Sequence, residues 1–306
     1  MDISRSLANL CTKALTESMD TGTMTHVAKE FFPWYNLNER MGFPPSLSVP
    51  NVDAARQIVT DVIAEDLTME FILMLMQIDD QGLKGRRIHI AYLRDIVKEI
   101  YNQGYIFDKE SRIFIENPRI RKTRNWGILI KEREYAFTFL RIDIEGSSRL
   151  VKKYPKDDIH SVYADLRRIV QAAVETRNGR IWSWEGDGGL ASFFYGNKDY
   201  HATLAAMEIL HELYLYNRMD NPIGQPVSVR IAVHSGRCEY VTSDGELKKA
   251  EPIKKIMDAE QNHTQANHVT ISVVVRQMLD SILANQFMQS GHTSSGYYSY
   301  SMELAK

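Results

Sequence analysis

Residues 137–148 read Phe-Thr-Phe-Leu-Arg-Ile-Asp-Ile-Glu-Gly-Ser-Ser, and residues 184–193 read Trp-Glu-Gly-Asp-Gly-Gly-Leu-Ala-Ser-Phe. The first stretch predicts a strand that delivers Asp143 just before a turn at Gly146. The second predicts a glycine hairpin with Asp187 at its tip. Carboxylates at the ends of two adjacent strands can hold two divalent ions against phosphate groups, so the two motifs together indicate a metal site.

The elements around these motifs follow the order β-α-β-β-α-β. Hydrophobic periodicity predicts strands over 136–142, 180–185, 189–195 and 226–233 and helices over 157–177 and 199–218. A helix (252–261), a strand (269–272) and a helix (273–284) are predicted to follow. The order is ferredoxin-like and brings both acids near one edge of the sheet. We therefore expect an α+β domain over residues 126–306.

Residues 1–125 are expected to form a separate, mainly helical accessory domain. Apolar residues recur at helical spacing over 53–76 and 89–103, and two short β-prone runs follow within 104–116. Helices followed by a hairpin resemble a winged helix. Residues 84–124 are locally basic, which is typical either of a solvated face or of a surface that contacts nucleic acid or a partner.

Composition indicates an ordinary soluble globular protein. The 306 residues are 44% hydrophobic and 25% charged, with a net charge of -2, which argues against a general nucleic-acid coat. Cys11 and Cys238 have no metal-ligand spacing and no disulfide framework, as expected in a reducing cytoplasm. The longest apolar run, 71–78, is too short to span a bilayer, and the N-terminus does not read as a signal peptide. We expect a cytoplasmic location and no membrane partner.

Each aspartate alone has a simpler interpretation. Asp143 could cap the helix that follows it, and Asp187 could be an ordinary turn residue. Their joint occurrence in this order of elements favours a metal pair. Together with Arg-Ile-Ala-Val-His-Ser-Gly at 230–236, the two motifs resemble the catalytic domain of class III adenylate and guanylate cyclases, over about residues 135–285.

The resemblance implies a reaction and its cofactors. Two Mn²⁺ or Mg²⁺ ions would be held by Asp143, Asp187 and the backbone carbonyl of Ile144. The ribose 3′-hydroxyl of a nucleoside triphosphate would then attack the α-phosphorus, which yields a 3′,5′-cyclic nucleotide and pyrophosphate. Such domains work as head-to-tail homodimers in which each subunit supplies half of each of two shared active sites.

The chain departs from the purine-specific members of that family. The position four residues before the second metal aspartate holds Lys in adenylate cyclases and Glu in guanylate cyclases, and here it is Ser183. The transition-state Asn and Arg of the family fall on Lys254 and Asp258. Arg141, Arg237 and Lys254 are candidates for binding phosphate, because cationic groups are expected where charge develops in phosphoryl transfer.

The strand before Asp187 reads Arg180-Ile-Trp-Ser-Trp184, which resembles the signature of pyrimidine cyclases from the bacterial antiphage system Pycsar. Those enzymes make cyclic UMP or cyclic CMP, which activates a separate effector protein. Arg180 and Trp184 are four residues apart on a strand, so a regular strand would place both on one face as base-recognition residues. The alternative is that the tryptophans are core aromatics and Arg180 a strand-edge charge.

The sequence therefore predicts a pyrimidine nucleotide cyclase, with UTP preferred over CTP, that acts in antiphage defence. One alternative is an adenylate cyclase with an altered purine pocket. Another is a non-catalytic, dimeric DNA-binding regulator, although the presence of both Asp143 and Asp187 argues against a scaffold. His234 is predicted to be structural rather than a general base.

Overall fold

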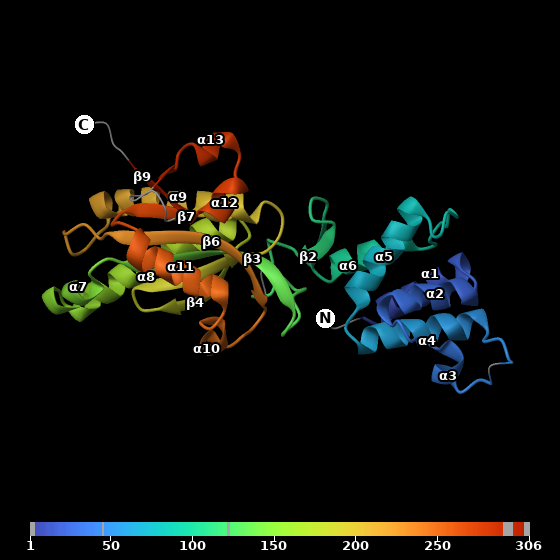
Figure 1. The fold of residues 1–306 in the computed structure, drawn as a ribbon. Helices are drawn as coiled ribbons and strands as arrows, with labels where there is room; N and C mark the ends of the chain where they lie inside the picture. The colour runs from blue at the N-terminus through green and yellow to red at the C-terminus, as the bar shows by residue number, and fades with distance from the viewer. Residues whose placement is uncertain (1–3, 45, 121–122, 290–295, 303–306) are drawn as a thin grey trace. The chain divides into compact units, whose positions relative to one another are not determined.

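The computed structural model describes residues 4–44, 46–120, 123–289 and 296–302. The chain separates into two compact units, Met1–Ile128 and Leu129–Lys306, and each is described by itself (Figure 1). Arg121 and Lys122, which belong to the basic segment of the sequence, lie outside the described residues.

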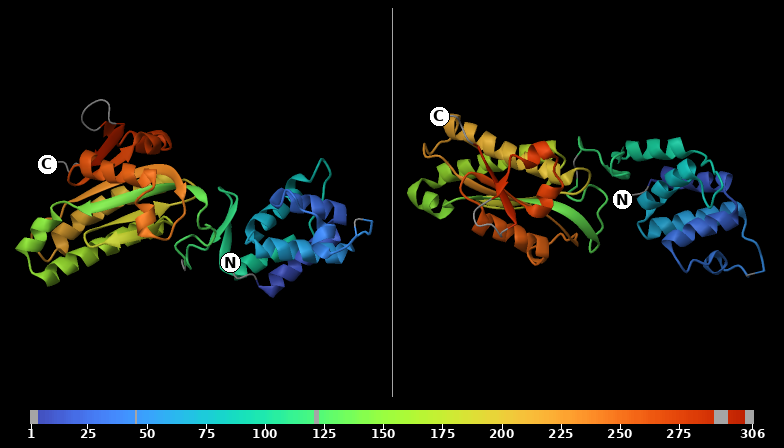
Figure 2. Two further views of the ribbon diagram at one scale, coloured as in Figure 1. Left: turned by 60° about the horizontal axis from the view of Figure 1, so that its bottom comes forward. Right: turned by 45° about the horizontal axis from the view of Figure 1, so that its top comes forward.

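The first unit is a set of packed helices followed by a hairpin. The helices are α1 (Arg5–Ser18), α2 (Thr21–Phe31), α3 (Leu37–Met41), α4 (Asn51–Ala64), α5 (Thr68–Gln81) and α6 (Leu93–Asn102). Helix α4 packs against α1 and α2, and α1 also contacts α6 (Figure 2). The antiparallel hairpin of β1 (Tyr105–Asp108) and β2 (Ile113–Glu116) confirms the two predicted β-prone runs. The winged-helix interpretation stays a prediction.

Two features of this unit differ from the sequence-based expectation. Helices α1 to α3 were not predicted as separate elements, since residues 1–50 show a mixed polar and aromatic character in the sequence. The single helical pattern over 53–76 is divided between α4 and α5, since Asp66 lies between them in the left-handed region with φ of 54°. Within the described parts of the chain, no helix is both long and apolar enough to cross a membrane.

The second unit is built on a seven-stranded sheet of order β4-β5-β3-β6-β7-β9-β8. The strands are β3 (Glu134–Ile144), β4 (Arg180–Glu185), β5 (Gly188–Phe193), β6 (Val229–Glu239), β7 (His268–Ser272), β8 (Met288–Gln289) and β9 (Tyr297–Ser301). Strand β3 pairs antiparallel with both β5 and β6, as the predicted order β-α-β-β-α-β requires. The α+β class is thus confirmed, whereas β8 and β9 were not predicted.

Helices cover both faces of this sheet. They are α7 (Ser147–Lys153), α8 (Lys156–Thr176), α9 (Lys198–Met219), α10 (Asp244–Leu247) and α11 (Glu251–His263), followed by the short α12 (Val273–Gln277) and α13 (Ser281–Ala284). The predicted helix over 273–284 is therefore two helices, since Asp280 caps the second by accepting a hydrogen bond of 2.8 Å from Leu283 N.

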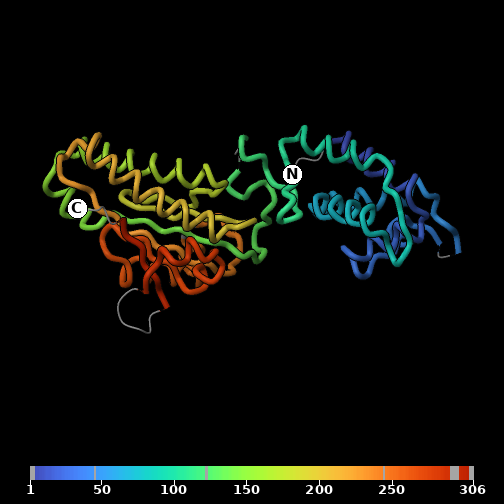
Figure 3. The backbone as a smooth tube through the Cα atoms, turned by 90° about the horizontal axis from the view of Figure 1, so that it is seen from above, coloured from blue at the N-terminus to red at the C-terminus, as the bar shows by residue number. Residues whose placement is uncertain are grey.

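The side chains of β3 alternate between two different environments. Leu140, Ile142 and Ile144 are buried in the main core with residues of α8 and α9. Phe139, Arg141 and Asp143 alternate with them along the strand and therefore point to the opposite face. Arg141 there lies near Glu260 of α11, the helix that packs on β3 and β6 (Figure 3). The face that carries Asp143 is therefore the α11 face of the sheet.

Candidate active site

Asp143 and Asp187 are brought together by the register of β3 and β5. Asp143 is directly opposite Gly188, the residue that follows Asp187 in the tight turn between β4 and β5. Gly186 begins this turn with φ of 55°, a conformation that favours glycine. A Cβ atom on Gly188 would lie 3.0 Å from Oδ1 of Asp143. Glycine at this position therefore allows β5 to approach β3 closely, which brings the turn with Asp187 next to Asp143.

The negative charge of Asp187 acts on the carboxyl group of Asp143. Burial raises the pKa of Asp143, the hydrogen bond from Arg230 opposes this shift, and the nearby charge of Asp187 adds to it. The net effect is a pKa above the ordinary value of an aspartate. A site that holds two carboxylates this close favours a bound cation, because a cation relieves their mutual repulsion.

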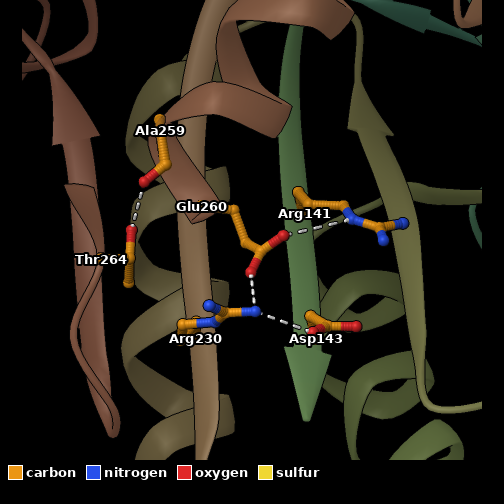
Figure 4. Close-up of polar contacts among 6 residues, drawn as sticks. All are labelled: Arg141, Asp143, Arg230, Ala259, Glu260 and Thr264. Atoms are coloured by element: carbon orange, nitrogen blue, oxygen red, sulfur yellow. Dashed lines mark hydrogen bonds and ion pairs between the residues drawn. The ribbon is translucent and has the colours of Figure 1, made fainter. Parts of the chain in front are cut away.

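A buried glutamate that was not predicted completes the site (Figure 4). Nη2 of Arg230 donates a hydrogen bond of 3.0 Å to Oδ2 of Asp143 and forms an ion pair of 2.8 Å with Oε1 of Glu260. Nε of Arg141 lies 4.0 Å from Oε2 of the same glutamate. Glu260 is 1% exposed, and desolvation raises its pKa while Arg230 opposes the shift.

Several polar atoms of this cluster lack hydrogen-bond partners among the described residues. They are Nε of Arg141, Nε of Arg230 and Oε1 of Glu260, and all three are buried. The close approach of Arg230 to Glu260 is thus an ion pair without good hydrogen-bond geometry. Buried polar atoms without partners are uncommon, and their concentration beside Asp143 is what a binding site requires.

The residues fit a cation that is shared with a ligand better than one enclosed by protein. Within the described ranges, no group of three or more His, Cys, Asp or Glu is placed to hold a metal ion. Asp143 and Asp187 carry the hard oxygen atoms that such a cation prefers, and the carbonyl of Ile144 is adjacent in sequence. Mg²⁺ is usually bound by one or two carboxylates together with substrate phosphates, so this donor set suits a metal–nucleotide complex.

The three predicted phosphate-binding residues occupy different places. Arg141 lies on the α11 face, two residues before Asp143 on β3. The register partner of Asp143 on β6 is Arg230. Arg237 lies seven residues further along β6, about 23 Å from Arg230. Its Nε contacts Oε2 of Glu134 at 2.9 Å. Lys254 lies on the exposed side of α11. Only Arg141 is therefore close to Asp143 of the same chain.

The expectation that Arg180 and Trp184 share one face of β4 is wrong. The register of β4 and β5 shifts between Ile181 and Ser183, which makes Trp182 the extra residue of a β-bulge. Arg180 is opposite Ser192, and Trp184 is opposite Gly189; these partners are three residues apart on β5 and point to opposite faces. The bulge thus separates the two predicted base-recognition residues.

The contacts of the two side chains agree with this separation. Arg180 is buried, and its Nη1 donates to Oδ1 of Asn178 at 2.8 Å and to the carbonyl of Gly179 at 3.0 Å. Trp184 packs against the main core, and its indole N–H donates to the carbonyl of Gly186 at 3.2 Å. Trp182 packs against Phe137 and Phe139 on the α11 face. The alternative interpretation of the tryptophans as packing residues fits these contacts.

We expect Trp184→Ala to lower the free energy of unfolding by about 2 kcal/mol, because a partly buried indole is removed from the main core. Chemical denaturation measures the change, and Trp184→Phe should retain most of the stability. Unchanged stability of Trp184→Ala together with altered use of nucleotide bases would instead restore the recognition role.

His234 is buried on the α11 face, as its structural interpretation requires. Its Nδ1 lies 2.9 Å from Oγ of Ser272, and burial lowers its pKa to about 4. The neutral imidazole joins β6 to the end of β7.

The only sequence signal for Glu260 is that a glutamate lies among the apolar residues that repeat at helical spacing in α11. The buried residues of α11 are Pro252, Ile253, Ile256, Ala259 and Glu260. A glutamate in an apolar stripe requires a buried cationic partner. The sequence alone does not say that this partner is Arg230, thirty residues earlier.

No protein-family model and no curated protein matches the chain, whereas solved structures do. The guanylyl cyclase domain of the RhoGC fusion protein from the aquatic fungus Blastocladiella emersonii is 14% identical, with 56% of this chain and 98% of that chain covered and a TM-score of 0.46. The adenylyl cyclase CyaB from P. aeruginosa is 12% identical, with coverage of 57% and 96% and a TM-score of 0.46. The adenylate/guanylate cyclase/hydrolase from Silicibacter pomeroyi is 19% identical, with coverage of 56% and 99% and a TM-score of 0.45. The function of this chain therefore has to be inferred from its own residues.

Proposed function

We propose that this chain is a nucleotide cyclase that converts a nucleoside triphosphate into a 3′,5′-cyclic nucleotide and pyrophosphate. The observation that supports this best is the placement of Asp143 beside the Asp187 turn by the register of β3 and β5. Divalent cations bound there would neutralise the triphosphate and lower the pKa of the ribose 3′-hydroxyl. Asp143 and Asp187 hold the cations, and Arg141 supplies positive charge on the same face.

The proposal includes a homodimer with two shared active sites. Arg237 and Lys254 are exposed cations, and Arg237 lies far along β6 from the register partner of Asp143. In a head-to-tail dimer, such residues can approach the phosphates bound at the Asp143 of the partner. Their phosphate-binding role thus belongs, in this proposal, to the second subunit.

We further propose that the base is a pyrimidine, with UTP preferred over CTP. Ser183 is opposite Leu190, which is opposite Arg141, so Ser183 lies on the α11 face together with Asp143. Its hydroxyl is too short to act as the Lys or Glu that reads purines in the cyclases that the motifs resemble. Arg180 remains on the same face as Ser183, and Trp184 does not.

The same proposal gives the product a signalling role. The motif that contains Arg180 and Trp184 resembles that of antiphage pyrimidine cyclases. A separate effector protein that binds the cyclic nucleotide would then be the partner of this pathway, and the cyclase itself would act in the cytoplasm.

A panel of the four ribonucleoside triphosphates tests the base. The purified 306-residue protein is incubated with Mn²⁺ and each triphosphate, and the products are separated by chromatography against cyclic nucleotide standards. Cyclic UMP is expected as the main product, with cyclic CMP second. Turnover of ATP or GTP alone would contradict pyrimidine use. The absence of any product with Mn²⁺ or Mg²⁺ would favour a non-catalytic regulator.

A further inference from the structure

Arg230 pairs with the carboxylate group of Asp143, which the proposed function assigns to a metal ion. Its Nη2 atom lies 3.0 Å from Oδ2 of Asp143 and 2.8 Å from Oε1 of Glu260 (Figure 4). One nitrogen of a guanidinium group thus bridges two carboxylates from different elements, β3 and α11. A side chain in this position acts as an internal cation for Asp143.

The two carboxylates differ in how firmly they are held. Glu260 is 1% exposed and projects from the buried face of α11. The last turn of α11 is fixed by a hydrogen bond of 2.8 Å from Oγ1 of Thr264 to the carbonyl of Ala259 (Figure 4). The side chain of Asp143 is 21% exposed and lies where its strand ends. Arg230 therefore has one buried, fixed partner and one partner that a solvent-borne cation can reach.

A divalent cation and Arg230 compete for the same oxygen atom. When the cation binds Oδ2 of Asp143, Arg230 has to release it, and Glu260 still compensates the guanidinium charge. Nε of Arg230 and Oε1 of Glu260 are buried without hydrogen-bond partners in the described chain. A small rotation of the guanidinium toward Glu260 would allow these atoms to form a hydrogen bond, which would offset part of the loss.

We propose that Arg230, anchored by Glu260, holds Asp143 in the metal-free protein and is displaced when a divalent cation binds. Arg230 thereby weakens cation binding, and Glu260 is a positioning residue that limits how tightly Arg230 pairs with Asp143. The inference rests on the proposed function, because it takes Asp143 as a cation ligand.

Binding of Mn²⁺ alone tests this inference without any turnover. The loss of the free-ion signal in electron paramagnetic resonance gives the Kd of the 306-residue protein. The double variant Arg230→Gln/Glu260→Gln removes the competing cation together with the buried carboxylate that the single variant would leave without its main partner. Its Kd for Mn²⁺ should be roughly tenfold lower than that of the wild type. A neighbouring positive charge lowers the pKa of a carboxylate by about one unit or more, and we expect it to weaken the binding of a metal cation to a similar degree. Glu260→Gln alone should bind Mn²⁺ more weakly than the wild type.

Two controls make the measurement specific. Arg168→Gln removes an exposed arginine that pairs with Asp165 on α8 at 3.2 Å, and it should leave the Kd unchanged. Asp143→Asn in the double-variant background should abolish the gain. The inference would be overturned if the Kd of the double variant equalled or exceeded that of the wild type. It would also be overturned if neither the wild type nor the double variant bound Mn²⁺. Tighter Mn²⁺ binding by the double variant, together with no cyclic product from the wild type, would instead refute only the proposed reaction.

Discussion

Asp143→Asn is expected to lower the rate of cyclic-nucleotide formation by about a thousandfold or more and to leave the fold intact. Loss of a carboxylate ligand removes several kcal/mol of stabilisation of the transition-state charge, which corresponds to about three factors of ten. Asparagine has nearly the same size and can still accept the hydrogen bond from Arg230. Product chromatography measures the rate, and circular dichroism with thermal unfolding reports the fold.

The matched control for this variant is another carboxylate of the same unit. Asp165→Asn changes an aspartate that pairs with Arg168 on α8, and it should retain the wild-type rate. Asp187→Asn should behave like Asp143→Asn, since the register of β3 and β5 brings the two acids together. A rate for Asp143→Asn close to that of the wild type would show that this residue does not hold a catalytic cation.

Arg230→Gln is expected to lower the free energy of unfolding by about 3 kcal/mol, because it leaves the buried carboxylate of Glu260 without its main partner. Arg141, at 4.0 Å, compensates only part of the charge. Urea unfolding at neutral pH measures the change. The double variant Arg230→Gln/Glu260→Gln should recover most of the lost stability, since both groups are then neutral.

The loss of stability in Arg230→Gln should depend on pH in a defined direction. Burial raises the pKa of Glu260 in the folded protein above its value in the unfolded chain. The folded state then binds more protons, so stability falls as the pH rises from the ordinary glutamate range through the folded-state pKa. This fall should extend to higher pH in Arg230→Gln than in the wild type. In the double variant the contribution of Glu260 should be absent, whereas that of Asp143 remains.

An exposed ion pair provides the comparison for this effect. Arg237 and Glu134 are 69% and 56% exposed, and removing their pairing should cost at most about 0.5 kcal/mol. If Arg230→Gln were no more destabilising than Arg237→Gln, the buried pair would not stabilise the unit.

The parts of the site that were predictable from sequence are those set by local signals. The apolar run that leads into Asp143 predicted β3, and the glycines around Asp187 predicted the turn that ends β4. The predicted order β-α-β-β-α-β places β5 next to β3, which brings Asp143 to the turn that carries Asp187. The two aspartates could therefore be placed together before the structure was known.

The parts that were not predictable depend on contacts between distant residues. The bulge at Trp182 exists because β4 has one more residue than the segment of β5 that it pairs with, and this moves Trp184 to the other face from Arg180. The pairing of Arg230 with Glu260 joins β6 to α11. The spacing of residues in the sequence predicts neither the bulge nor this ion pair. Both features change the interpretation of the site.

Whether the site formed by Asp143 and Asp187 cyclises a nucleotide can be read from the products of a single reaction. Purified wild-type protein is incubated with Mn²⁺ and UTP, and the products are identified by mass spectrometry, with Asp143→Asn as the control. The proposed function predicts cyclic UMP and pyrophosphate in equal amounts from the wild type and neither from the variant. Formation of UDP and phosphate, or equal amounts of cyclic UMP from both proteins, would contradict it.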